Sequence, residues 1–171
     1  TDPIWCDLLA TNGKMIDVIV QKTKSVHILA DGVPSEKLLQ FISSDEIDQV
    51  DALIDCGALL VGYSCEEVAK YLLQHLIEQS RTLKGVTFDD DKRGDWMILE
   101  KSGRCLTRVQ SSLQEKETFV VFDEPRCRGV DMKLRSDAVA VMTLGQNLTK
   151  DKFMQAAGRM RKLHSNQSLI I

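Results

Sequence analysis

Five basic side chains lie between residues 152 and 164 of a chain that is acidic overall: Lys152, Arg159, Arg161, Lys162 and His164. The sequence has 22 Lys and Arg against 25 Asp and Glu, which gives a formal net charge of −3. Because no net positive field surrounds such a molecule, only a local group of cations can attract an anion. These side chains could form that group, or they could complement the dipole at the carboxyl end of a helix.

The spacing of apolar residues predicts a helix that is capped by Thr149 and runs to His164. At about 100° per residue, one side of this helix is apolar and would face a core. Arg161 falls at the border between the two sides. The opposite side carries an amide, a glycine that would permit close approach, and two cations one turn apart: Gln155, Gly158, Arg159 and Lys162.

A second polar segment, RCRGVDM, lies between two apolar runs that are typical of buried strands, TFVVFDE and AVAVMTL. Gly129 can adopt unusual backbone angles, and Asp131 can accept hydrogen bonds from hydroxyl groups. Both strands end in polar loops. We expect these loops at the carboxyl edge of a parallel sheet, where open α/β sheets bind their ligands.

The strings RGVD and, after one further strand, QAAGRMRK resemble motifs V and VI of superfamily 2 helicases and related ATPases. ALLVGYSCEEVAKYLL resembles the strand and helix that open the same lobe. The resemblance covers roughly residues 55–171 and implies a second RecA-like lobe with motifs IV to VI. Longer strings are similar to the C-terminal helicase-like region of very long eukaryotic proteins, often labelled ubiquitin hydrolases of the thiol protease class.

The resemblance implies roles for particular residues. Asp131 would contact a nucleotide ribose, and Gly129 would shape its loop. Arg159 would contact phosphate, with Gln155 as a polar positioner. The arginine finger that stabilises transition-state charge falls at position 162, which is Lys162. Lysine keeps the charge but lacks the planar fork of arginine, and the neighbouring Arg161 points partly sideways.

The implied cofactor is ATP, with magnesium held mainly by a first lobe that this chain lacks. No GxxxxGKS or GxxxxGKT string is present, so we expect the chain alone to bind no nucleotide. The implied partners are a first RecA-like lobe and, across both lobes, nucleic acid or another polymer. The alternative is a non-catalytic, helicase-like scaffold that binds a protein partner. We expect neither a metal site nor a membrane partner.

A thiol hydrolase is a third hypothesis, which rests on the label of the resembling proteins. Five cysteines occur, with no CxxC pair: Cys6, Cys56, Cys65, Cys105 and Cys127. A nucleophilic thiol needs a base within hydrogen-bond reach. Cys56 with His75, or Cys127 with His164, could be proposed, but reduced, buried thiols in an intracellular protein, cytoplasmic or nuclear, explain the set better.

Short apolar runs alternate with helical stretches, which predicts an α/β fold: a three-layer αβα sandwich with a mostly parallel sheet. Residues 25–31, 57–63, 118–124 and 138–144 are predicted strands, and 85–110 a partly hairpin segment of two or three. Ser64 and Glu67 are spaced as a capping box, which predicts the start of a helix. The acidic run 89–91 reads as a solvated turn. Residues 1–54 are expected to be the N-terminal part of the lobe or a linker, and 55–171 the lobe itself, in one compact domain cut from a longer protein.

Overall fold

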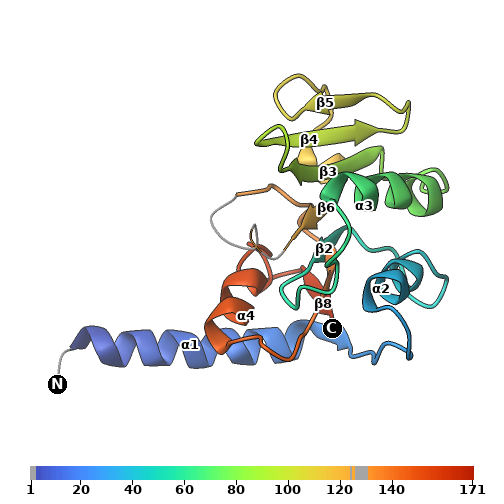
Figure 1. The fold of residues 1–171 in the computed structure, drawn as a ribbon. Helices are drawn as coiled ribbons and strands as arrows, with labels where there is room; N and C mark the ends of the chain where they lie inside the picture. The colour runs from blue at the N-terminus through green and yellow to red at the C-terminus, as the bar shows by residue number, and fades with distance from the viewer. Residues whose placement is uncertain (1–2, 124, 126–130) are drawn as a thin grey trace.

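The computed structural model describes residues 3–123, 125 and 131–171, with residues 3–12 described by their backbone alone. Its fold is α/β, with an eight-stranded, mostly parallel sheet and helices on both faces of that sheet (Figure 1). The predicted fold class is confirmed to this extent. Two residues of the sequence-based hypotheses, Gly129 and Cys127, lie outside the described residues.

The sheet contains six parallel strands and an antiparallel extension at one side. The strands lie in the order β1 (Thr23–Ser25), β8 (Ser168–Ile170), β7 (Val139–Met142), β2 (Ala52–Ile54), β6 (Phe119–Phe122), β3 (Gly85–Asp90), β4 (Asp95–Glu100) and β5 (Cys105–Thr107). Strands from both ends of the sequence therefore belong to one sheet.

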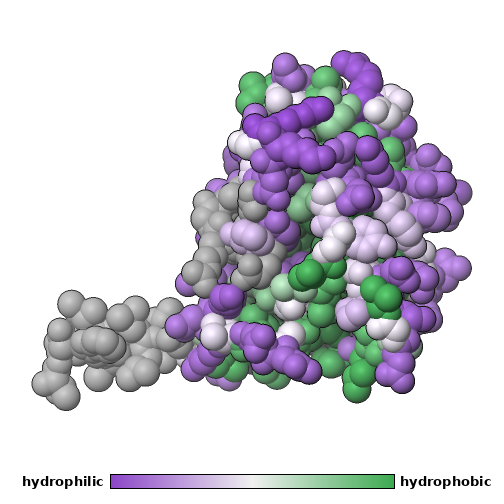
Figure 2. Space-filling view, in the orientation of Figure 1, coloured by the Kyte–Doolittle hydropathy of each residue, from purple (hydrophilic) through white to green (hydrophobic). Residues whose placement is uncertain are grey.

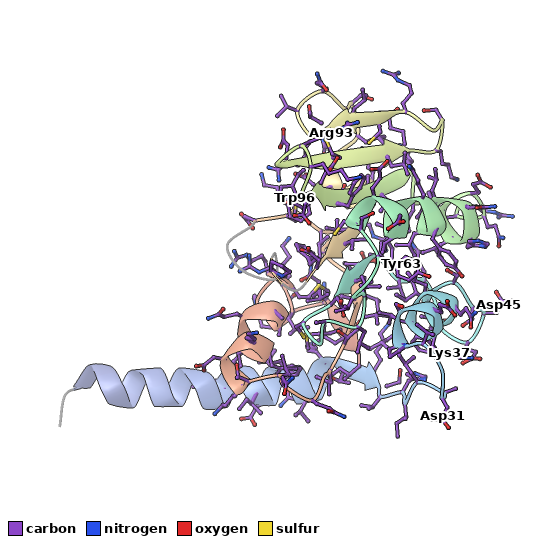
Figure 3. All side chains as sticks on the ribbon, viewed as in Figure 1. Asp31, Lys37, Asp45, Tyr63, Arg93 and Trp96 are labelled. Atoms are coloured by element: carbon purple, nitrogen blue, oxygen red, sulfur yellow. The ribbon has the colours of Figure 1, made fainter. Side chains whose placement is uncertain are left out.

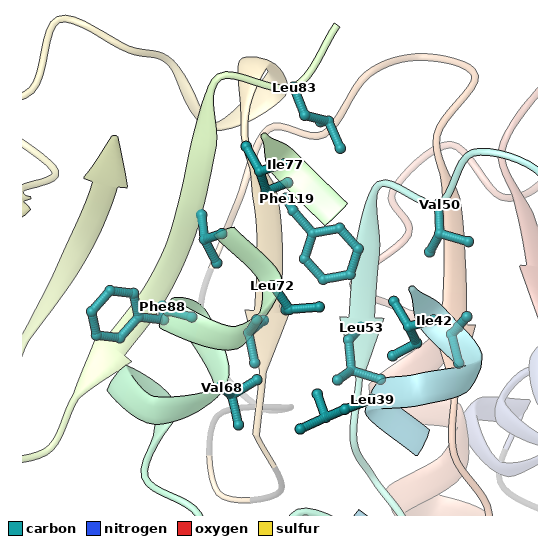
Figure 4. Packing of buried hydrophobic residues seen from close by; sticks show 14 of the residues in the cluster. Leu39, Ile42, Val50, Leu53, Val68, Leu72, Ile77, Leu83, Phe88 and Phe119 are labelled. Atoms are coloured by element: carbon teal, nitrogen blue, oxygen red, sulfur yellow. The ribbon is translucent and has the colours of Figure 1, made fainter. Parts of the chain in front are cut away.

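Helices α2 (Pro34–Ile42) and α3 (Cys65–Leu72), the latter continued by the π-helical turn η1 (Leu73–Ile77), pack on one face of the sheet. Helices α1 (Pro3–Lys22) and α4 (Lys150–Ala157) pack on the other face. Residues of the central strands alternate between the two cores: Leu53 faces α2 and α3 (Figure 4), whereas Ala52 and Ile54 face α4. A short 3-10 helix, η2 (Glu115–Glu117), precedes β6.

The predicted start of the helix after residue 63 is confirmed in atomic detail. The Ser64 hydroxyl accepts from the Glu67 amide at 3.2 Å, and the Glu67 carboxylate accepts from the Ser64 amide at 2.8 Å. These two bonds form a capping box, which satisfies amides that have no partner inside the helix. The predicted strands at 118–124 and 138–144 are present as β6 and β7, and the hairpin segment as β3, β4 and β5.

The prediction of a strand at 57–63 is wrong, because the strand in this part of the chain is β2, which ends at Ile54. The apolar run forms turns instead, and Ala58 adopts a positive φ of 54°. The Asp55 carboxylate holds these turns, since its two oxygens accept from the Leu59 and Leu60 amides, both at 2.9 Å. The predicted strand at 25–31 is also mostly wrong, because β1 ends at Ser25.

The solvated turn predicted at the acidic run is confirmed for Asp91, which is exposed in the turn at residues 91–94, and is wrong for the two aspartates before it. Asp89 and Asp90 belong to β3, and Asp90 is only 7% exposed. Its carboxylate accepts from the Lys92 amide at 2.9 Å and lies 3.4 Å from the Arg93 guanidinium. Arg93 and Trp96 mark the hairpin at the top of Figure 3. Asp90 is therefore a buried cap of the β3–β4 turn.

The close approach of two backbone segments at the carboxyl edge of β2 and β7 gives a stability prediction. A Cβ atom on Gly57 would lie 2.6 Å from the Leu144 carbonyl carbon, and backbone cannot move aside cheaply. We expect Gly57→Ala to lower the free energy of unfolding by about 2 kcal/mol.

Gly13 is the matched control, because it lies in α1 and a Cβ there would meet nothing within 4 Å. Gly13→Ala should raise the free energy of unfolding by up to about 1 kcal/mol through helix propensity. Urea denaturation followed by circular dichroism measures both variants. Equal effects of the two substitutions would contradict the backbone contact.

Candidate functional site

The helix that carries the predicted site begins as expected and ends earlier. The Thr149 hydroxyl accepts from the Lys152 amide at 3.3 Å, which confirms the predicted cap. The helix α4 ends at Ala157, with Gly158 as its C-cap at φ −63° and ψ −12°. The predicted continuation to His164 is wrong. Residues 158–166 form successive turns instead, which we call the basic turn segment.

The directions of the basic side chains after residue 157 therefore do not follow from the faces of a helix. In the basic turn segment Arg159 is half-buried, whereas Arg161 and Lys162 are exposed. Two apolar side chains, Met160 and Leu163, are buried against the core beneath α4. They fix the segment against the sheet, while Arg161 and Lys162 reach solvent. On α4 itself, Gln155 is exposed, as the predicted polar side requires.

Asp131 and Arg161 bring the two predicted motifs together. The Arg161 Nε atom donates to the Asp131 Oδ1 atom at 3.2 Å, which joins the segment between β6 and β7 to the basic turn segment. Their side chains are 69% and 56% exposed, so the pair contributes little to stability. Sequence reasoning placed Arg161 at a border of the helix and did not foresee this contact.

The buried side-chain amide of Gln167 holds the basic turn segment in place. Gln167 is 2% exposed, its Oε1 atom accepts from the Lys162 amide at 2.8 Å, and its Nε2 atom donates to the Arg135 carbonyl at 2.8 Å. Sequence reasoning missed this residue. The available signal was a pair of polar residues, Gln167 and Ser168, before a run of apolar ones, where a strand begins.

The basic turn segment lies at the amino-terminal edge of the sheet, opposite to the carboxyl edge at which the polar loops after the two predicted strands were expected. The segment leads from α4 into β8, so it reaches the sheet at the amino-terminal end of that strand. Arg135 lies at the same edge, before β7, and its guanidinium is 3.2 Å from Asp137 and 3.8 Å from Asp51. Burial raises the pKa of Asp51, which also accepts from the Val139 amide at 3.0 Å.

The carboxyl edge itself is closed between β2 and β7, where the chain leaves the sheet in opposite directions. Thr143 donates from its hydroxyl to the Asp55 carboxylate at 2.7 Å and accepts from the Gly57 amide at 2.9 Å. Open α/β sheets bind ligands at such a point. Here protein groups occupy the hydrogen-bonding positions of the Asp55 carboxylate.

An apolar cavity of about 500 Å³ lies beside this closed point. It is lined mainly by residues 26–32 and 141–144 and by apolar side chains of α2. Figure 2 shows hydrophobic side chains gathered on the lower half of the visible face and hydrophilic ones over the hairpin. The described site residues predicted from the sequence, including Asp131 and Arg159, do not line this cavity.

The thiol-hydrolase hypothesis meets opposing evidence at Cys56. Burial and the nearby Asp55 raise the pKa of the Cys56 thiol to about 12, and its Sγ atom donates to the Thr143 carbonyl at 2.9 Å. A nucleophile must be a thiolate, so this cysteine is inert at neutral pH. His75, its hypothetical base, stacks on Tyr71 with ring centroids 4.3 Å apart.

The described residues contain no group of three or more His, Cys, Asp or Glu side chains placed to hold a metal ion. None of the helices described combines the length and the apolar character needed to span a bilayer. Comparison with models of protein families, with curated proteins and with solved structures finds no match for this chain.

Proposed function

We propose that this chain is the second RecA-like lobe of a helicase-like, ATP-dependent module, similar to the C-terminal helicase-like region of very long eukaryotic proteins often labelled ubiquitin hydrolases. The module would hydrolyse ATP with water to ADP and phosphate. A first lobe would hold the magnesium ion and most of the nucleotide. The present chain would supply side chains to the phosphates and the ribose, and a polymer would cross both lobes.

The contact between Asp131 and Arg161 is the observation that carries this proposal. It joins the RGVD and QAAGRMRK strings, which are separated by the complete strand β7 and the first part of α4, within 3.2 Å on the exposed surface. Exposed cations beside an exposed carboxylate fit a nucleotide. Guanidinium and ammonium groups bind phosphate oxygens, and a carboxylate accepts hydrogen bonds from ribose hydroxyls.

Different residues of this chain would contact different parts of the nucleotide. Arg159 and Lys162 would bind phosphate oxygens, with Arg161 beside them. Asp131 would bind the ribose once Arg161 turns from it to the phosphates. Lys162 stabilises developing charge with a single ammonium group, so we expect slower hydrolysis than an arginine at this position would give.

A non-catalytic scaffold is the second candidate, and the same ion pair favours it. Asp131 and Arg161 pair with one another, so each already has a partner within the chain. A lobe with lysine at the finger position would retain its fold for protein binding. Such a lobe would bind its protein partner equally well with and without ATP.

Binding of a fluorescent ATP analogue tests the first candidate. A protein that joins this lobe to a first lobe should bind the analogue with a saturable affinity, whereas the 171-residue chain alone should bind none. If the two-lobe protein binds no nucleotide but captures a protein partner equally well with and without ATP, the scaffold is the correct function.

A further inference from the structure

Gln167 is the side chain that joins the two segments of the candidate site. One end of its amide accepts from the backbone of Lys162, and the other end donates to the backbone of Arg135. Lys162 belongs to the basic turn segment, and Arg135 follows Asp131 by four residues in the other segment. A single buried amide thus spans the same two segments that Asp131 and Arg161 join at the surface.

The surface pair cannot hold this geometry by itself. Asp131 and Arg161 are both exposed, and an exposed ion pair is screened by salt and weakened by side-chain entropy. The Gln167 amide is buried, and its loss would leave the Lys162 backbone amide without this acceptor and the Arg135 carbonyl with only the Ala138 amide, at 3.2 Å. The buried contact therefore sets the spacing, and the surface pair follows it.

The Arg135 end of the bridge that Gln167 forms is fixed to the central strands of the sheet. Arg135 pairs with Asp137 and lies 3.8 Å from Asp51. Asp51 accepts from the Val139 amide at the start of β7, and its own backbone amide donates to the Val139 carbonyl at 2.7 Å. Through Arg135, Gln167 thus connects the basic turn segment to the paired strands β2 and β7.

We propose that Gln167 is a positioning residue for a phosphate-bearing nucleotide. It touches no ligand, and it acts by fixing the Lys162 backbone so that the neighbouring cations face the Asp131 segment. This inference rests on the proposed function for the identity of the ligand. The positioning itself is a property of the 171-residue chain and can be measured without any nucleotide.

Two substitutions separate the two ends of the bridge. Gln167→Met retains the length of the side chain and removes both hydrogen bonds. Gln167→Glu keeps an acceptor for the Lys162 amide and loses the donor to the Arg135 carbonyl. Ile42→Val is the control, because Ile42 is buried on the opposite face and the change lowers stability without touching the bridge.

The first readout is amide hydrogen exchange of the chain alone, measured by NMR. Gln167→Met should accelerate exchange at Lys162 by about 10-fold or more, and Gln167→Glu should restore much of the protection. Ile42→Val should leave Lys162 protected relative to its neighbours. Unchanged exchange at Lys162 in Gln167→Met would overturn the positioning role.

The second readout is the affinity of the two-lobe protein for the fluorescent ATP analogue. Gln167→Met should raise the Kd about 10-fold, and Ile42→Val should not change it. Equal Kd values for these two variants would overturn the inference even though nucleotide binds. If the wild-type two-lobe protein binds no nucleotide, the proposed function fails, and the exchange measurement still decides the positioning role.

Discussion

Replacing Asp55 by alanine is expected to lower the free energy of unfolding by about 4 kcal/mol. The Asp55 carboxylate is 2% exposed and accepts three hydrogen bonds, from the Leu59 and Leu60 amides and from the Thr143 hydroxyl. Alanine would leave all three donors without their partner in the interior. Since domains of this kind are stable by about 5–15 kcal/mol, the loss is a large share of the total.

The matched control is Asp45→Ala, because Asp45 lies exposed after α2 (Figure 3). Its free energy of unfolding should remain within about 0.5 kcal/mol of the wild type. The free energy of unfolding of Asp55→Asn should lie between those of Asp55→Ala and Asp45→Ala. Asparagine keeps one oxygen as an acceptor, but its NH2 group would face a backbone N–H, which is also a donor. Chemical denaturation of the four proteins checks the order, and a loss of less than about 1 kcal/mol in Asp55→Ala would contradict the structure.

This aspartate also explains why the candidate site does not lie at the carboxyl edge. Asp55, Thr143 and Gly57 close the point where the chain leaves β2 and β7 in opposite directions. The cations are found instead on turns that enter β8 from its amino-terminal end. In this chain the usual ligand position of a parallel sheet is used for stability.

The features that sequence reasoning predicted correctly are those with local signals. The Ser64–Glu67 capping box needs residues three apart, and the strands β6 and β7 are apolar at every position. Both signals reflect physical requirements of one element, namely a satisfied helix end and a strand covered on both faces. The predicted Thr149 cap is correct for the same reason.

The errors arose where tertiary contacts override a local pattern. The apolar run 57–63 resembles a buried strand, but the Asp55 carboxylate fixes it as turns. The helical pattern after Gly158 is likewise interrupted, because Met160 and Leu163 reach the core from turns. Apolar spacing alone cannot distinguish a further helical turn from such a segment.

The hydrogen bonds of the candidate site were beyond reach from sequence. Asp131 and Arg161 are thirty positions apart, and Gln167 joins Lys162 to Arg135 across a strand and a helix. A sequence indicates which residues could bind an anion, whereas the pairing depends on how two connections pass one another. The candidate residues were identified from the resemblance to motifs V and VI, whereas their hydrogen bonds are visible only in the folded structure.

Arg159→Ala is expected to lower kcat for ATP hydrolysis by about 100-fold or more in a protein that joins this lobe to a first lobe. In the proposed site the Arg159 guanidinium would stabilise the charge that develops on the phosphates in the transition state, and alanine would remove this cation. Lys162→Arg should act in the opposite direction, because the planar fork of arginine contacts two phosphate oxygens. The matched control is Arg81→Ala, since Arg81 is exposed and lies outside the basic turn segment.

The central claim is that this chain supplies cations to a nucleotide shared with a first lobe. Steady-state ATP hydrolysis by the wild-type two-lobe protein, Arg159→Ala and Arg81→Ala tests it most directly. The proposal predicts hydrolysis in the wild type and in Arg81→Ala, with at least about 100-fold less in Arg159→Ala. Equal rates in Arg159→Ala and Arg81→Ala, or no hydrolysis by the wild type, would contradict the claim.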